Sequence, residues 1–483
     1  MKQHQLPEWV RKHKIKGTQI NKIRNNFYLY KIKSVWDPEK RRAVKKNEKY
    51  LGRITEEGLK RPKYERVFDE IKEVTVKEYG ASRLINKIGA DIKKDLKRIY
   101  PENWESILSF AVLRFFENSP IKNLGYHFAH SHLSELFPNA KLNPKSVSEL
   151  LDIIGSRRDK VVEFMNSQKF GSENLIVDLT HIFSSSENIN LLSCGHNSEE
   201  TYHKQFNMLL LFSKDKNMPV FFRIIDGAIK DVSSIKNLIE ETQIKEATFV
   251  GDKGFFSEGN EGIFNAGKLN FIFPLRRNSL LIDYSLIKNF ERKKFDGYFF
   301  FDGRHIWYKE MKKDRKRIIL FFDERLKTEE ENSFLDRISK KQTSMKEFYE
   351  KEHTFGTIAV IVSSKKSSCE KVYQFLKARI NIESAFDAFK NVLEADKTYM
   401  QNTSKLHGWM FINFISLQMY YLIYGMLLKN KLLNNFSPKD IILHFSKVYK
   451  IKLSEKEIIS EVPKTTRILM EKMKLDTNLL LNS

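Results

Sequence analysis

The apolar residues of this chain recur with helical spacing in some stretches and with strand spacing in others. Residues 105–116 form an apolar helical pattern between Pro101 and Pro120, where a helix is expected to start and stop. Short runs rich in β-branched and aromatic residues predict strands. These runs lie near 174–180, 206–213, 219–226 and 270–275, with a helix near 231–242 before another run at 247–250. The pattern predicts a mixed α+β (α/β) protein.

Changes in this pattern divide the chain into six predicted regions. The regions are a basic β-rich part (1–65), a helical part (66–168), the central strands (170–275), a β-rich insertion with a charged helical piece near 324–350 (276–365), a second central part (366–428) and a helical tail (429–483). The insertion is inferred because the interval between the last central strand and the following helix is far longer than a simple connection.

One stretch, residues 408–428, approaches the length of apolar sequence that a membrane-spanning helix needs. Asn413, Ser416 and Gln418 interrupt it, and the rest of the chain is charged throughout. We therefore expect a buried helix that covers the central sheet, and no membrane partner.

The charge of the chain indicates a polyanionic partner. The net charge is +23, and residues 1–63 hold nineteen Lys or Arg against six Asp or Glu. Aromatic residues, including Trp9 and Trp36, lie among these bases. Basic side chains contact phosphates, although they do not by themselves read a base sequence.

Cysteine usage excludes a disulfide framework. The chain has two cysteines, Cys194 and Cys369, which fits a reducing cytosol, so a cytoplasmic, nucleoid-associated protein is expected. Cys194 and His196 lack companion ligands for zinc. The N-terminus is polar and charged, without the apolar segment of a secretory signal.

The most informative stretch is residues 379–390, in which Glu383 lies between two bases on a predicted helix. Arg379 lies one turn before Glu383, and Lys390 two turns after it, on the same face. A carboxylate between cations suits a site that holds metal and grips phosphate. An ordinary amphipathic helix with ion pairs explains the same residues, so this motif alone does not decide.

Two aspartates strengthen the first interpretation. Asp178 is predicted at or near the end of the strand at 174–180, and Asp252 follows the run at 247–250 in a turn flanked by Gly251 and Gly254. We expect these glycines to let the backbone bend sharply and to leave room for a ligand. Three hard oxygen ligands from separate segments suit Mg²⁺.

The ordered set resembles the DDE transposases of prokaryotic insertion sequences, specifically the IS-four group. That group has Asp in a D-L-T-like strand, Asp in a D-[RK]-G-F turn and a Tyr-x₂-Arg-x₃-Glu-x₆-Lys helix. This chain has Asp178-Leu-Thr180, Asp252-Lys253-Gly254-Phe255, and Arg379, Glu383 and Lys390 at the family spacing. It departs at the Tyr, where it has Leu376; Tyr373 is nearby, on a different helical face. Further family-like landmarks are Gly195–Ser198, Asp226-Gly227 with Asp231, and His407-Gly408.

The resemblance implies an RNase H-like catalytic core with a β-rich insertion, preceded by a basic and helical DNA-binding region. It implies a transposase that cleaves the ends of an insertion sequence and joins them to target DNA. Asp178, Asp252 and Glu383 would be catalytic and would bind Mg²⁺ (or Mn²⁺), with two ions in all. Arg379, Lys390 and Lys253 would contact DNA phosphates. The partners would be double-stranded DNA, as terminal inverted repeats and target, and a second copy in a synaptic dimer.

Two other functions remain open at this stage. One is a catalytically inactive or domesticated DNA-binding repressor, and the other is an RNase H-like nuclease without strand transfer. Among the nearby polar residues, Asp231 is expected to cap a helix, and His181 is expected to be structural or DNA-facing rather than a metal ligand. Asp226 lies beside the core without a predicted role in metal binding.

Overall fold

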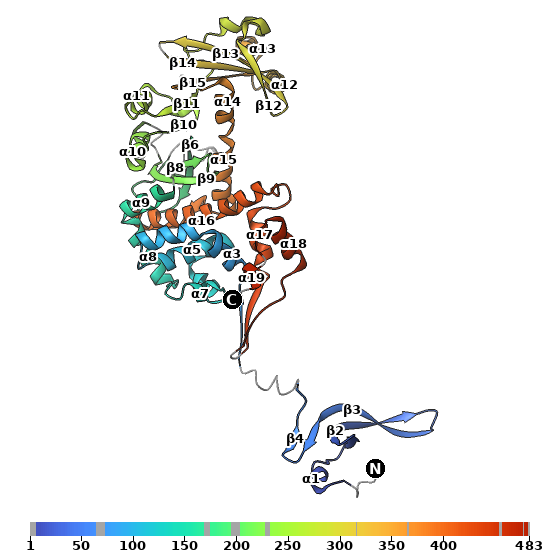
Figure 1. The fold of residues 1–483 in the computed structure, drawn as a ribbon. Coiled ribbons are helices and arrows are strands. Elements are labelled where there is room, and N and C mark those ends of the chain that lie inside the picture. The colour runs from blue at the N-terminus through green and yellow to red at the C-terminus, as the bar shows by residue number, and fades with distance from the viewer. Residues whose placement is uncertain are drawn as a thin grey trace. The chain divides into compact units, whose positions relative to one another are not determined.

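The computed structural model describes residues 6–63, 73–168, 174–194, 203–227, 232–314, 316–364, 367–453, 456–476 and 478–481. The chain forms two compact units (Figure 1). Unit 1 comprises residues 1–77 and 449–461, and unit 2 comprises 78–448 and 462–483. The sequence positions Gly195–Ser198, His196 and Asp231 lie outside the described residues.

Unit 1 contains a four-stranded antiparallel meander. Its elements are α1 (Glu8–Arg11), β1 (Thr18–Ile23), β2 (Asn26–Asp37), β3 (Arg42–Thr55) and β4 (Gly58–Lys60), with the strands in the order β1-β2-β3-β4. Val10 of α1 packs with Phe27, Leu29 and Ile54 in a small core. This core covers only the base of the β2–β3 hairpin.

Unit 1 also contains a three-stranded sheet that the sequence did not predict. It has the order β18-β17-β5, from β5 (Val74–Glu78), β17 (Tyr449–Leu453) and β18 (Lys456–Ile459). The expectation of a helical tail over 429–483 is therefore wrong for residues 449–459. Tyr449-Lys-Ile-Lys-Leu453 does alternate with the period of a strand, but over only five residues, and its pairing to β5 depends on a segment far away in sequence.

A helical layer opens unit 2. Its helices are α3 (Gly80–Ile88), α4 (Ala90–Ile99), α5 (Trp104–Glu117), α6 (Leu124–Ala129), α7 (Leu133–Leu136), α8 (Pro144–Gly155) and α9 (Arg158–Gln168). Asn143 caps α8, since its side chain accepts a hydrogen bond from the Ser146 amide, and Pro144 occupies the first helical position.

An eleven-stranded mixed sheet follows, in the order β12-β13-β14-β15-β11-β10-β6-β8-β7, with β9 paired to β8 and β16 to β6. Its strands are β6 (Asn174–Ser184), β7 (Ser193–Cys194), β8 (Lys204–Ser213), β9 (Met218–Asp226), β10 (Thr248–Val250), β11 (Asn270–Pro274), β12 (Gly297–Phe301), β13 (Arg304–Lys313), β14 (Lys316–Asp323), β15 (Thr357–Val362) and β16 (Lys397–Thr398). β10 is parallel to both β6 and β11, and β16 is parallel to β6. The whole is thus a mixed α+β protein with several sheets.

Residues 276–365 contribute β12–β15 to this sheet. β15 pairs antiparallel with both β14 and β11, so the strands of the predicted insertion continue the central sheet edge to edge. The other elements of unit 2 are α10 (Val232–Thr242), α11 (Glu258–Ala266), α12 (Glu324–Ser339), α13 (Met345–Lys351), α14 (Cys369–Lys377), α15 (Ile380–Asp387), α16 (Thr403–Lys429), α17 (Pro438–Phe445), α18 (Lys464–Lys472) and α19 (Asn478–Leu481), with one-turn helices η2–η7 between them.

The long apolar helix α16 lies between the sheet and the helical layer, where it contacts β9, α5 and α8. By length and composition it could cross a bilayer, but 67% of its most apolar window is buried inside the protein. Its polar residues bond across these contacts: Ser416 Oγ donates to Ala111 O (2.8 Å), and Gln418 Nε2 donates to Pro219 O (3.2 Å). A Cβ at Gly408 would lie 2.2 Å from Leu151 O, so only glycine permits this approach of α8.

Candidate active site

Asp178 lies in the middle of β6, not at its end. The strand continues to Ser184 because residues 179–183 pair with β8 as far as Gln205. The prediction of a strand ending near 180 was therefore too short. The Asp178 side chain is 18% exposed, and its Oδ1 accepts a hydrogen bond from the Leu179 amide at 2.8 Å.

The pairing of the parallel strands β6 and β10 brings the two aspartates into the same region of the sheet. Val250 of β10 is paired with Ile176 of β6. Asp178 stands two residues after Ile176 within β6, and Asp252 stands two residues after Val250, just past the end of β10. β10 ends at Val250, so Asp252 emerges from the carboxyl end of its strand beside a strand that continues. Such an edge is where α/β sheets place ligand sites.

The turn around Asp252 is shaped by packing rather than by glycine flexibility. Neither Gly251 nor Gly254 has a positive φ. A Cβ at Gly251 would lie 2.9 Å from Phe273 Cε1 and 3.1 Å from Phe255 Cδ2, whereas a Cβ at Gly254 would meet nothing within 4 Å. Gly251 is thus needed to seat the turn on the aromatic core. The expectation that both glycines let the backbone bend sharply is not confirmed, because both have backbone angles that other residues adopt.

Arg379 binds both aspartates. Its Nη1 lies 3.1 Å from Asp252 Oδ1, and its Nη2 lies 3.5 Å from Asp178 Oδ2. The guanidinium is 18% exposed, whereas Asp252 is 41% exposed. Arg379 Nε is buried and has no hydrogen-bond partner among the described residues. The sequence spacing predicted a phosphate-binding arginine on the helix of Glu383, but did not reveal that it reaches the two acids.

Burial raises the pKa of Asp178 above its usual value. The Leu179 amide and the Arg379 guanidinium lower this pKa, and the neighbouring Asp252 carboxylate raises it further. The loss of water around the carboxylate outweighs the favourable contacts. A raised pKa in a partly buried carboxyl beside a charge partner is a property of many functional sites.

Glu383 lies in the first turn of α15, and its side chain is exposed. It stands one turn after Arg379, on the same face of the helix. α15 contacts β6 and β8, so this face adjoins the strand of Asp178. Among the described residues, no three His, Cys, Asp or Glu side chains gather closely enough to hold a metal ion. The structure therefore brings Asp178 and Asp252 together, with Glu383 on the adjoining helix.

Lys390 lies beyond the regular part of the predicted helix. α15 ends at Asp387, and residues 388–392 form a single π-turn, a feature common at functional sites. The wider turn changes the expected stacking of Lys390 over Glu383. Its Nζ lies 3.5 Å from His181 Nε2, and the His181 ring packs on Phe183 at 5.0 Å. The prediction that His181 is structural or DNA-facing is compatible with this position.

Leu376 and Tyr373 are both core residues. Leu376 is 8% exposed and Tyr373 is 1% exposed, and both belong to the cluster that joins α14 to β12–β15. The Tyr373 ring meets Phe299, Phe301 and Phe321 at centroid distances of 4.9–5.4 Å. Burial raises its pKa to about 12. The interpretation that they lie on different helical faces was wrong, since residues three apart share a face.

The remaining predicted polar residues lie near the site without joining it. Lys253 is exposed in the turn after Asp252. Asp226 ends β9 and accepts a hydrogen bond from Ser193 Oγ at 2.6 Å.

Two of the three predicted metal ligands, Asp178 and Asp252, lie close enough to one cation to be compared with a site for a hard divalent ion. Asp178 and Asp252 already share one cationic group, since each contacts a different nitrogen of the Arg379 guanidinium. Carboxylate oxygens are the ligands that Mg²⁺ and Mn²⁺ prefer. The two aspartates fit such an ion, and Glu383 is the nearest candidate for a further ligand by its place on α15.

Comparison with known proteins identifies the family. The family model described as the transposase DDE domain matches residues 171–419, more than half of the chain. No curated protein matches the chain. Among solved structures, it is similar to a piggyBac transposase synaptic complex with hairpin DNA, at 12% identity and a TM-score of 0.36, over 71% of this chain and 70% of that one. It is also similar to a Mos1 transposase paired-end complex with the left transposon end, at 10% identity and a TM-score of 0.15, over 32% of this chain and 58% of that one.

The chain belongs to the transposase DDE domain family, which suggests a DNA-cleaving, phosphoryl-transfer enzyme that depends on divalent metal. The matched region begins just before β6 and ends within α16, so it includes Asp178, Asp252, Arg379 and Glu383.

Proposed function

We propose that this transposase belongs to the IS-four group, that it cleaves DNA at the ends of an insertion sequence, and that it joins these ends to target DNA. The observation that carries the proposal is the convergence of Asp178 and Asp252 on one guanidinium. Acids from β6 and from the end of β10 meet there, although 73 intervening residues separate them in the sequence.

The proposed catalytic acids are Asp178, Asp252 and Glu383, and they would hold two Mg²⁺ (or Mn²⁺) ions. When bound, the ions supply charge that stabilises the attacking and leaving oxygens of an in-line phosphoryl transfer. Asp178 contributes a partly buried carboxylate whose position is fixed by the Leu179 amide. Asp252 contributes a more exposed carboxylate, accessible to a nucleic acid strand.

The proposed phosphate-binding residues are Arg379, Lys390 and Lys253. The guanidinium of Arg379 presents a planar set of donors that matches phosphate geometry. In the absence of DNA, its Nη1 and Nη2 contact the two acids, and its Nε is buried without a partner among the described residues. Lys390 contacts His181 of β6, and Lys253 follows Asp252 in the sequence, so both are candidates for contacts further along the bound strand.

The strand order supports an RNase H-like core. Within the large sheet, β9, β8 and β6 form an antiparallel meander, and β10 and β11 follow β6 in parallel. We propose residues 170–275 and 366–428 as the two halves of this core, with 276–365 as the insertion. The regions 1–65 and 66–168 would bind DNA, and 429–483 would serve dimerisation or DNA contacts. The working form would be a cytoplasmic homodimer that pairs two DNA ends.

The test uses the full chain and a supercoiled plasmid that carries the DNA flanking the gene on both sides. With Mg²⁺, cleavage at the ends followed by joined products is expected. Asp178→Asn, Asp252→Asn and Glu383→Gln should each abolish cleavage and leave DNA binding intact. Glu370→Gln, an exposed carboxylate on α14, is the matched control and should cleave normally.

The outcomes separate the proposal from its two alternatives. Nicked DNA without joined products would favour a nuclease. Binding without any cleavage would favour a repressor. Cleavage retained by one of the three variants would remove that residue from the catalytic set.

A further inference from the structure

The outer part of the β2–β3 hairpin in unit 1 is a basic ribbon, here defined as residues 31–49. It holds eight Lys or Arg against three Asp or Glu. β1 pairs only with residues 26–31 of β2, and β4 only with residues 53–55 of β3. The outer part of the ribbon is therefore two-stranded, and no other strand of the described residues pairs with it.

Two lysines of the ribbon are directly opposite each other. Lys33 of β2 is paired with Lys46 of β3. Both are exposed, and neither has a carboxylate partner among the described residues. Like charges directly opposite across a ladder are destabilising. An anion placed between the two lysines would relieve this repulsion, so the pair is a local site for negative charge.

The ribbon neutralises a neighbouring lysine pair but not this one. Lys31 and Lys49 are also opposite each other. The register then shifts by one residue at Glu48, whose Oε2 lies 3.1 Å from Lys31 Nζ. This β-bulge brings a carboxylate to the base of the ribbon and increases its local twist. Lys31 thus has a carboxylate partner on the ribbon, whereas the facing pair Lys33 and Lys46 has none among the described residues.

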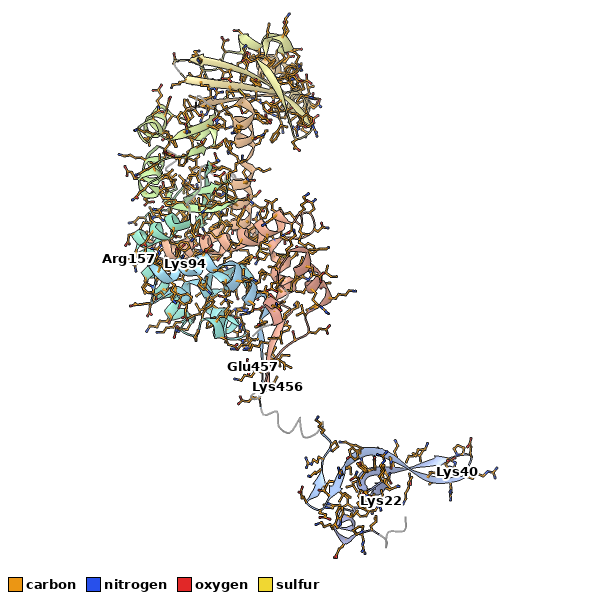
Figure 2. The ribbon with its side chains drawn as sticks, viewed as in Figure 1. Lys22, Lys40, Lys94, Arg157, Lys456 and Glu457 are labelled. Atoms are coloured by element: carbon orange, nitrogen blue, oxygen red, sulfur yellow. The ribbon has the colours of Figure 1, made fainter. Side chains whose placement is uncertain are left out.

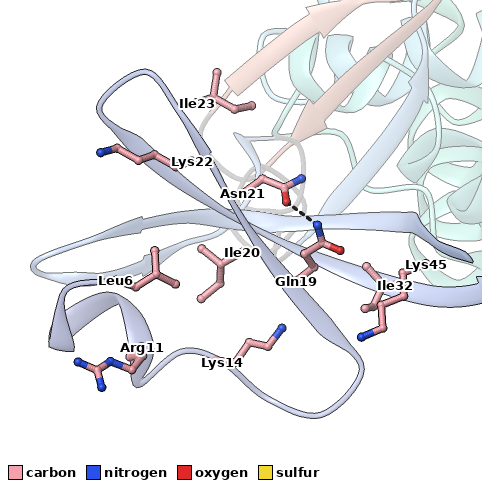
Figure 3. A pocket seen from close by; sticks show the side chains of 10 residues that line it. All are labelled: Leu6, Arg11, Lys14, Gln19, Ile20, Asn21, Lys22, Ile23, Ile32 and Lys45. Carbon is pink, nitrogen blue, oxygen red and sulfur yellow. Dashed lines mark hydrogen bonds between the residues drawn. The ribbon is translucent and has the colours of Figure 1, made fainter. Parts of the chain in front are cut away.

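The other face of the ribbon borders a groove of about 930 Å³. Ile32 and Lys45 of the ribbon line this groove with residues of α1, of the following turn and of β1 (Figure 3). Its basic side chains are Arg11, Lys14, Lys22 and Lys45, and Gln19 and Asn21 add amides joined by a hydrogen bond of 2.9 Å. Lys14 donates to Thr18 O. Both faces of the ribbon are therefore cationic.

The exposed tip completes the surface. Lys40 lies at the tip of the hairpin and Lys22 beside its base (Figure 2). Trp36 is 65% exposed on β2, opposite Ala43. An isolated two-stranded ribbon is at best marginally stable in water. A cationic ribbon with an exposed aromatic side chain thus has the properties of a surface that a polyanion covers.

We propose that the basic ribbon enters the major groove of duplex DNA, with Lys33 and Lys46 on the phosphates. This inference rests on the proposed function only in that a transposase must bind DNA. The ribbon itself lies outside the region that the family model matches. The major groove of B-form DNA is about 12 Å wide and admits a two-stranded β-ribbon. The seven residues from 31 to 37 span about 23 Å, enough to cross that groove.

Duplex RNA is the weaker alternative on geometric grounds. The major groove of A-form RNA is deep and narrow, and side chains on a ribbon cannot enter it. The ribbon would meet only the outer phosphates of such a duplex. The groove assignment therefore predicts a preference for duplex DNA over duplex RNA of the same length and sequence.

The sharpest test is Lys46→Glu in the full chain, with a random-sequence 30-base-pair DNA duplex as the probe and EDTA present. A carboxylate opposite Lys33 relieves the repulsion across the ladder, so the melting temperature should stay the same or rise. Binding should weaken at each salt concentration, and the slope of log affinity against log salt should become shallower by about 2. A residue with a purely structural role would not move these two properties in opposite directions.

A second ribbon variant and a matched control distinguish an effect of the ribbon from a general effect of charge. Lys33→Gln/Lys46→Gln keeps the side-chain length and should also make the salt slope shallower by about 2. Lys340→Glu makes the same charge change at an exposed residue just after α12, a helix with five Asp or Glu and three Lys or Arg, and should leave DNA binding unchanged. Binding that is equal in the wild type and both ribbon variants would overturn the proposal.

Chemical protection decides the groove. Dimethyl sulfate modifies guanine N7, which faces the major groove. Protection of N7 in the wild-type complex, lost with Lys46→Glu, is the expected result. Equal binding of duplex RNA without N7 protection would overturn the groove assignment. These assays need no cleavage, so an inactive catalytic site would leave them unaffected, and a failed ribbon would leave the cleavage test unaffected.

Discussion

Asp178 of β6 and Asp252, which follows the end of the neighbouring parallel strand β10, are joined by the guanidinium of Arg379 at 3.5 and 3.1 Å. Two carboxylates this close repel each other unless a cation lies between them. In this chain, Arg379 supplies that cation. Any divalent ion that binds both acids must therefore compete with an internal positive charge.

Arg379 should compete with a divalent ion for the two carboxylates. Arg379→Gln removes the internal cation and leaves two facing carboxylates, so Mn²⁺ should bind the DNA-free protein more tightly than it binds the wild type. Isothermal titration calorimetry measures the affinity. The same variant should cleave DNA poorly, because Arg379 is proposed to bind phosphate. Weaker or unchanged Mn²⁺ affinity would show that Arg379 does not compete for the acids.

The two glycines that flank Asp252 provide a matched pair. Gly251→Ala would bring a Cβ to 2.9 Å from Phe273 Cε1 and should destabilise the fold by about 1–3 kcal/mol, as overpacking does. Because residue 251 directly precedes Asp252, a shift of this turn would move the Asp252 carboxylate, and cleavage should fall as well. Gly254→Ala meets no atom within 4 Å and should change neither property. Urea unfolding and the cleavage assay measure both; equal effects of the two variants would contradict the packing argument.

Restoring the family tyrosine at position 376 should harm the protein. Leu376 is buried in the cluster with Val372, Tyr373 and Phe299. Leu376→Tyr adds volume and a hydroxyl group to this core, and the free energy of unfolding should fall by about 1–3 kcal/mol. Leu376→Met conserves volume and should cost less than about 1.5 kcal/mol. A stable Leu376→Tyr protein with faster cleavage would show that the side chain can reach the DNA.

His407 gives a prediction for pH. Burial first, and then Arg158 and Arg223, lower the pKa of His407 to about 4, against a smaller opposing effect of Glu241. The unfolded chain, with its higher histidine pKa, binds the proton first. Stability from this residue is therefore complete above pH 6.5 and is lost as the pH falls through 4.

His407→Gln should remove this pH dependence. Between pH 7.5 and pH 4.5, the variant should lose about 2 kcal/mol less of its free energy of unfolding than the wild type loses. Urea unfolding at the two pH values measures the difference. Parallel pH profiles of the two proteins would contradict the assignment.

Residue order predicted the central elements well. The apolar runs identified β6, β8, β9 and β11 and the helix α10 to within a few residues of their bounds. The identity of α16 as a buried helix also followed from its interrupting polar residues, which bond to neighbouring elements. Prediction fails where pairing is distant: the pattern of residues 429–483 favours helix, whereas residues 449–459 form the β17–β18 hairpin, whose partner β5 lies more than 370 residues earlier.

The candidate site divides in the same way. The order and spacing of Asp178, Asp252, Arg379 and Glu383 are properties of the sequence, and they were sufficient for the family. The place of Arg379 between the two acids, the burial of Leu376 and the π-turn that contains Lys390 depend on how α14 and α15 pack on the sheet. Sequence determines which side chains a segment carries and its local period. Distances between segments arise only from the packing of the whole chain, because each strand or helix is positioned by neighbours that are remote in sequence.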